Sequence, residues 1–98
     1  MDKNIEEALI VAHPERLKIF MALKNAKEPL FINKLAKIIN TDRKLVSYHL
    51  STLEQHGFVE SEFKVIKIPQ SKGKAGRFYK LTKKADETIP KLIKYLQT

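Results

Sequence analysis

The basic side chains of this chain are concentrated in one place. A stretch of 22 residues, 63–84, holds eight lysine and arginine residues and no acid, whereas acids and bases cancel in every other segment. The net charge of +8 is therefore local. The eight basic residues are Lys64, Lys67, Lys72, Lys74, Arg77, Lys80, Lys83 and Lys84. Because an acid-free basic stretch attracts a polyanion and releases its counterions on binding, we expect a nucleic acid partner.

A second set of polar side chains shares one face of a helix that we expect over residues 43–56. Val46, Leu50 and Leu53 recur at helical spacing and form its apolar face. The other face carries Arg43, Lys44, Ser47, Tyr48, Ser51 and Gln55. Basic side chains donate to guanine acceptors or phosphates, and hydroxyl groups bond to bases or to the backbone. We expect this face to contact the major groove of double-stranded DNA.

Three earlier helices must position that helix. Apolar residues at helical spacing predict a first helix over residues 5–12, and Pro14 fits the first position of a second helix. A third helix carries the apolar residues of the segment 32–39, and Asp42 is suited to cap the helix that follows. A tight turn at residues 40–41 would join the third and fourth helices into a helix-turn-helix unit.

The residues after Gly57 predict a β-hairpin. A run rich in β-branched and aromatic residues indicates a strand up to Ile68, residues 69–76 indicate an extended turn, and residues 77–81 a return strand. The hairpin therefore carries most of the basic stretch.

A last helix follows the hairpin. Thr82 can cap its N-terminus, and Pro90 must either kink this helix or mark a new start within it. The expected fold is mainly α with a small β-hairpin (α+β), a winged helix-turn-helix. We expect it to form a single domain over residues 1–98.

Three runs of the chain share a pattern with a known family. They are AHPERLKIF at residues 12–20, LVSYHLSTLEQHGFV at 45–59 and GRFYKLT at 76–82. These runs resemble the ArsR-type winged-helix transcriptional regulators, and the resemblance covers roughly residues 5–97. It implies homodimers that bind inverted-repeat operators and usually repress transcription.

The resemblance also implies that the first and last helices form the dimer interface. Both helices carry apolar residues at helical spacing, which could also pack only within the subunit. We favour a dimer interface, because the core of a small winged helix is already filled by its other elements. The expected interface residues are Ile5, Leu9, Ile89, Leu92, Ile93 and Leu96.

Many members of the family sense metal ions, but we expect no metal or other cofactor here. The chain has no cysteine, and its last helix offers Asp86 and Glu87 but no histidine. His49 and His56 would lie about 10 Å apart along a helix that rises ~1.5 Å per residue, too far to share one zinc ion. No acid is spaced to complete a catalytic triad with a serine and a histidine, so we expect no enzymatic activity.

We therefore expect a cytoplasmic, sequence-specific regulator of transcription that binds double-stranded DNA, acts as a repressor and has no membrane segment. Helix 43–56 would read the major groove, and the wing at residues 63–81 would contact the flanking backbone or minor groove. The expected wing contacts are Lys64, Lys67, Lys72, Lys74, Arg77 and Lys80. Two alternatives remain open: a winged-helix module that binds protein, and an architectural or RNA-binding protein.

Overall fold

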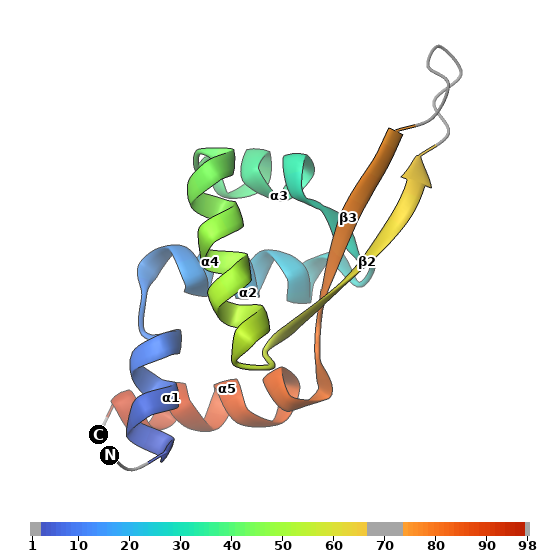
Figure 1. Cartoon of the computed structure of the whole chain (residues 1–98). Helices are drawn as coiled ribbons and strands as arrows, with labels where there is room; N and C mark the ends of the chain where they lie inside the picture. Colours follow the sequence, from blue (N-terminus) through green and yellow to red (C-terminus); the bar gives the residue numbers. More distant parts are fainter. Residues whose placement is uncertain (1–2, 67–73, 98) are drawn as a thin grey trace.

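The computed structural model describes residues 3–66 and 74–97, in which five helices pack together at the base of a small antiparallel sheet (Figure 1). The elements are α1 (Lys3–Val11), α2 (Pro14–Ala26), β1 (Leu30–Phe31), α3 (Ile32–Ile39), α4 (Arg43–Gln55), β2 (Val59–Ile66), β3 (Lys74–Leu81) and α5 (Lys83–Leu96). This arrangement is the winged helix-turn-helix expected from the sequence. None of the described helices is long and apolar enough to cross a membrane.

Local capping interactions begin the helices where the sequence predicted. Pro14 occupies the first turn of α2, and the Asp42 carboxylate accepts hydrogen bonds from the backbone N–H groups of Lys44 and Leu45 at the start of α4. The Thr82 hydroxyl accepts from the backbone N–H of Ala85, which caps α5. Pro90 lies inside α5, which continues through it.

The sheet contains one strand that the sequence analysis missed. The two residues of β1 pair with Tyr79 and Phe78 of β3, which gives the strand order β1-β3-β2. The hairpin of β2 and β3 extends away from the helices (Figure 1). β3 begins at Lys74, so residues 74–76 belong to a strand and not to the turn expected over residues 69–76. The remainder of that turn and the expected end of β2 fall partly on residues 67–73, outside the described part of the chain.

The core joins the helices to the base of the sheet. Its fully buried side chains include Ile19 of α2, Leu35 of α3, Leu50 of α4, Phe58 before β2 and Ile89 of α5. α1 and α5 lie side by side, at the opposite end of the described structure from the end of β2 and the start of β3 (Figure 1). α5 therefore completes the core of the subunit.

The packing of α5 corrects part of the expected dimer interface. Ile89 is 1% exposed and Leu92 is 4% exposed, because both pack into the subunit's own core. They are not available to a partner in this conformation. Apolar spacing predicts which face of a helix is buried, but it does not show whether the same subunit or a partner subunit buries it.

Candidate nucleic-acid interface

The polar face of α4 lies on the surface. All six residues expected to contact DNA on this helix are exposed, and Tyr48 has 60% of its surface accessible. They are Arg43, Lys44, Ser47, Tyr48, Ser51 and Gln55. The apolar stripe of Val46, Leu50 and Leu53 is buried on the opposite side. α4 thus offers a continuous polar surface while its other face anchors it to the core.

A tight turn between α3 and α4 sets the direction of α4. Asn40 adopts a left-handed conformation with φ 53°, and its backbone N–H donates to the carbonyl groups at the end of α3. Thr41 donates its hydroxyl hydrogen to the Glu15 carboxylate of α2 at 2.5 Å. This hydrogen bond lowers the pKa of the Glu15 carboxyl group below its ordinary value. The turn is therefore tied to the helix beneath it.

His49 fixes α4 to the N-terminus of α2. Its side chain is 2% exposed, and its Nδ1 accepts a hydrogen bond of 3.1 Å from Nε of Arg16. The His13 ring lies 4.4 Å from the His49 ring, centroid to centroid, and Arg16 also donates to the carbonyl of Ile10. Burial is the main cause that lowers the pKa of His49, and the electrostatic effect of the neighbouring His13 and Arg16 side chains adds to it. His49 is therefore a packed core residue whose neutral form is favoured.

The C-terminus of α4 is held by a lysine from the basic stretch. Lys84 Nζ donates to the carbonyl of His56, the C-cap residue, at 2.7 Å and lies 3.5 Å from the Glu7 carboxylate. It also lies 4.7 Å from the centroid of the Phe58 ring. The helix ends one residue earlier than predicted, because His56 is its cap. Lys84 therefore holds the end of α4 in place, a role that its position in the basic stretch of the sequence did not indicate.

Acids from elsewhere offset part of the positive charge of the basic stretch. Lys80 pairs with Glu60 across the β2–β3 register at 3.2 Å, and Lys83 pairs with Glu87 at 3.9 Å. The linear sequence alone did not show these pairings. Among the described side chains of the basic stretch, Lys64 and Arg77 form no ion pair with another described residue.

The register divides the described wing residues between two faces. Arg77 lies opposite Phe63 on the face that includes the buried Tyr79 and is turned toward α4. Lys64 and Lys80 lie on the other face, and Lys64 Nζ is 5.6 Å from the centroid of the Phe78 ring. Lys67 and Lys72 fall outside the described residues, as does the side chain of Lys74.

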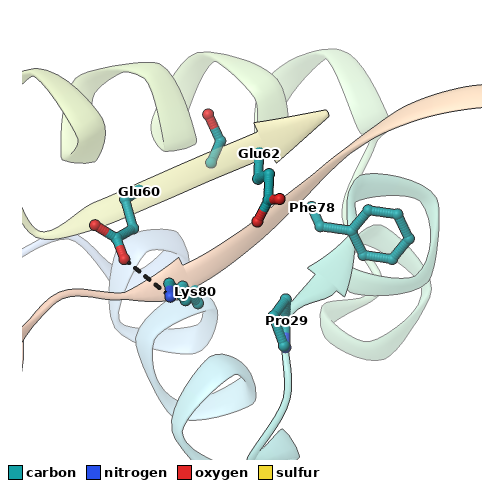
Figure 2. A pocket seen from close by; sticks show the side chains of 6 residues that line it. Pro29, Glu60, Glu62, Phe78 and Lys80 are labelled. Atoms are coloured by element: carbon teal, nitrogen blue, oxygen red, sulfur yellow. Dashed lines mark ion pairs between the residues drawn. The ribbon is translucent and has the colours of Figure 1, made fainter. Parts of the chain in front are cut away.

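The face turned away from α4 holds an acidic hollow. A cavity of about 240 Å³ is lined by Pro29, Glu60, Ser61, Glu62, Phe78 and Lys80. Figure 2 shows the ion pair of Glu60 with Lys80 as a dashed line and the Glu62 carboxylate further along the strand, toward Phe78. Carboxylates repel phosphate groups, so this hollow is less favourable for nucleic acid than the face turned toward α4.

Glu54 is a surface residue of α4 that the sequence analysis passed over. Its carboxylate accepts a hydrogen bond of 2.7 Å from the Ser61 hydroxyl, which itself accepts one of 2.8 Å from Arg77 Nη1. The sequence contained one signal of this: Glu54 is an acid on an otherwise polar and basic helix face, and a positively charged hairpin follows that helix. Only the three-dimensional structure shows that the acid is connected to an arginine of the wing.

The described part of the chain holds no group of three metal-ligating side chains. The Nδ1 atoms of both His13 and His49 accept hydrogen bonds from protein N–H groups, and His56 serves as a backbone cap. Among the expected dimer residues, Ile5 and Leu9 of α1 are exposed and Ile93 is half-buried, while the side chain of Leu96 lies outside the description.

Comparison with known proteins is consistent with this surface. Residues 11–62, which run from the end of α1 through α4 into β2, match the helix-turn-helix domain family. A comparison with curated proteins gives no match.

Solved structures of similar fold include regulators from several bacteria. Diamide-treated YodB from B. subtilis is 17% identical, with 99% of this chain and 89% of that one covered and a TM-score of 0.78. The transcriptional repressor BigR from Xylella fastidiosa is 25% identical, with 88% and 77% covered and a TM-score of 0.64. The homodimeric winged helix-turn-helix DNA-binding domain of Mb0332 from Mycobacterium bovis is 21% identical, with 96% and 72% covered and a TM-score of 0.58.

Proposed function

The chain belongs to the helix-turn-helix domain family and is a DNA-binding transcriptional regulator, and we propose that it reads the major groove with α4. The wing formed by β2 and β3 contacts the flanking backbone or minor groove. One observation carries this assignment: α4 exposes all six polar and basic residues of one face while its apolar stripe is buried. A helix so anchored presents its side chains to base edges without rearrangement of the core.

The groove contacts are Lys44, Ser47, Tyr48 and Ser51, with Arg43 and Gln55 at the margins. In the wing, the DNA contacts are Arg77, which lies on the face turned toward α4, together with Lys72 and Lys74. Lys64, Lys67 and Lys80 act on phosphates at longer range.

The regulator works as a homodimer and as a repressor of the ArsR type, in the cytoplasm. The Mb0332 domain is described as homodimeric and BigR as a repressor, which supports both statements. Ile5 and Leu9 on α1 are exposed and Ile93 on α5 is half-buried, so these described side chains offer apolar surface to a partner subunit. Two subunits would place half-sites about 10 bp apart or a multiple of that. We assign the single domain no catalytic role and no metal.

The test is a fluorescence-anisotropy titration of the protein's own promoter duplex and of a scrambled duplex at two salt concentrations. A regulator of this kind binds its operator about 10³-fold or more tightly than random DNA. Lys44→Ala should weaken binding and reduce the salt slope by about 0.9 if Lys44 contacts a phosphate, whereas Lys91→Ala on α5 should do neither. Equal binding to RNA and DNA, or binding to neither, would contradict the proposal.

A further inference from the structure

A carboxylate on the DNA-reading helix is electrostatically unfavourable, because phosphates repel it. Glu54 is exposed on α4, one residue before Gln55 of the proposed groove surface. Its carboxylate does not point to another residue of α4 but accepts the hydroxyl hydrogen of Ser61 on β2, at 2.7 Å. The acid therefore joins the recognition helix to the base of the wing.

The Ser61 hydroxyl also accepts a hydrogen bond from an arginine of β3. Arg77 Nη1 donates to Ser61 Oγ at 2.8 Å. A serine hydroxyl has one hydrogen and two lone pairs. Because Arg77 can only donate and the ionised Glu54 can only accept, the direction of both hydrogen bonds is fixed. The three residues form a chain from α4 through β2 to β3.

An aromatic ring supports the guanidinium from a second direction. Arg77 Cζ lies 4.2 Å from the centroid of the Phe63 ring, which is directly opposite Arg77 in the register. Phe63 is 61% exposed, so its ring lies at the surface together with the guanidinium. Stacking on a ring face is favourable for arginine, so this contact also restricts the position of the guanidinium.

We propose that Glu54 and Ser61 are positioning residues that hold Arg77 ready for one contact with the DNA backbone or minor groove beside α4. The guanidinium has five N–H donors in a planar fork, so the bond to Ser61 leaves others available to DNA. An arginine that is already ordered loses less side-chain freedom on binding. This inference rests on the proposed function and adds to it the residues that set the geometry of the wing.

The Glu54→Ala variant distinguishes a positioning role of Glu54 from a simple repulsion of DNA, because the two predict opposite changes in DNA affinity. If Glu54 were merely an acid near DNA, its removal would strengthen binding at low salt. If Glu54 positions Arg77, its removal should weaken binding to the operator by about 3- to 10-fold, the effect of one hydrogen bond. Glu62→Ala is the matched control, because Glu62 is an exposed acid of β2 on the opposite face. The control should leave affinity unchanged or raise it.

A double-mutant cycle tests the link to Arg77. Ser61→Ala and Arg77→Ala should each weaken operator binding, and the double variant should bind no more weakly than Arg77→Ala alone. Ser61→Thr keeps the hydroxyl and should retain most of the affinity. Thermal unfolding of every variant establishes that each is folded before its affinity is compared.

The outcomes separate this inference from the proposed function. Wild-type protein that binds no duplex overturns both. Wild-type protein that binds its operator while Glu54→Ala binds more tightly, or while the losses from Ser61→Ala and Arg77→Ala add up, overturns the positioning role alone. Weaker binding by Glu54→Ala together with a non-additive cycle supports it.

Discussion

Nε of Arg16 donates a hydrogen bond of 3.1 Å to Nδ1 of His49, joining α2 to the buried side of the recognition helix. Arginine remains protonated, so Nδ1 of His49 must supply a lone pair and the imidazole must be neutral. The Nε2 atom of His49 is buried without a hydrogen-bond partner among the described residues. A second proton on this ring would therefore break the bond to Arg16 and place a buried positive charge beside it.

We expect this arrangement to make the protein less stable in mild acid. The pKa of His49 is lowered by burial, so the unfolded chain binds a proton at a higher pH than the folded chain does. The neutral form contributes fully above the ordinary histidine value of about 6.5, and stability falls as the pH drops below it. Urea unfolding between pH 7.5 and pH 5.5 measures this.

The variant His49→Gln identifies the group responsible. Glutamine can accept from Arg16 through its amide oxygen but does not titrate. The loss of stability between pH 7.5 and pH 5.5 should shrink in this variant. An unchanged pH dependence would assign the effect to another residue. The Glu15 carboxyl group, whose pKa is also lowered, contributes stability that is lost only at lower pH.

Lys84 should matter for stability although it lies in a basic stretch. Lys84→Met keeps the aliphatic part of the side chain but removes the donor to the His56 carbonyl and the partner of Glu7. A hydrogen bond from a charged donor contributes about 1.5–3 kcal/mol, so the free energy of unfolding should fall by about that amount. Lys83→Met is the control. Its ion pair with Glu87 is exposed and should contribute less than about 1 kcal/mol.

Gly76 should tolerate no side chain while Phe31 is present. A Cβ atom at this position would overlap the Phe31 ring, which covers the backbone of β3. Gly76→Ala should therefore destabilise the protein by about 1–3 kcal/mol, in spite of the better strand propensity of alanine. In a Phe31→Ala background the same substitution should have little cost. Denaturant unfolding of the four proteins of this cycle provides the measurement, and equal costs in both backgrounds would exclude the ring as the cause.

Tyr48 tests whether α4 reads bases. Its ring is exposed and its backbone carbonyl accepts from Thr52, so removal of the side chain leaves the helix intact. Tyr48→Ala should weaken operator binding by about 1–3 kcal/mol and binding to random duplex by less. Anisotropy titrations with the operator duplex and with the random duplex measure the two losses of affinity. Equal losses would make Tyr48 a backbone contact.

Much of the fold was predictable because its signals are local. Pro14, Asp42 and Thr82 start helices through contacts with residues next to them, and apolar spacing identifies the buried face of α4. β1 was not predictable. Two residues show no alternation, and their pairing with Tyr79 and Phe78 spans the chain from α2 to the end of the wing.

The site was predictable in part for the same reason. The exposed residues of α4 follow from helical periodicity, which is local. The pairing of Glu60 with Lys80 depends on the register between two strands, and the chain from Glu54 to Arg77 depends on how α4 packs beside the hairpin. Likewise, the stripe that includes Ile89 was visible as apolar, but only packing shows that the subunit itself covers it.

The strand order has a consequence for self-association. β1 pairs with β3 only at Phe78 and Tyr79, so β3 is partly open on one side of the wing and β2 forms a long open edge on the other. Such an edge can recruit a strand from another molecule and start aggregation. Glu60, Glu62 and Lys64 place charges at alternate positions along this edge, so a second copy of β2 that pairs with it must desolvate charged groups. We expect these charges on β2 to disfavour intermolecular sheets in a concentrated solution of the protein.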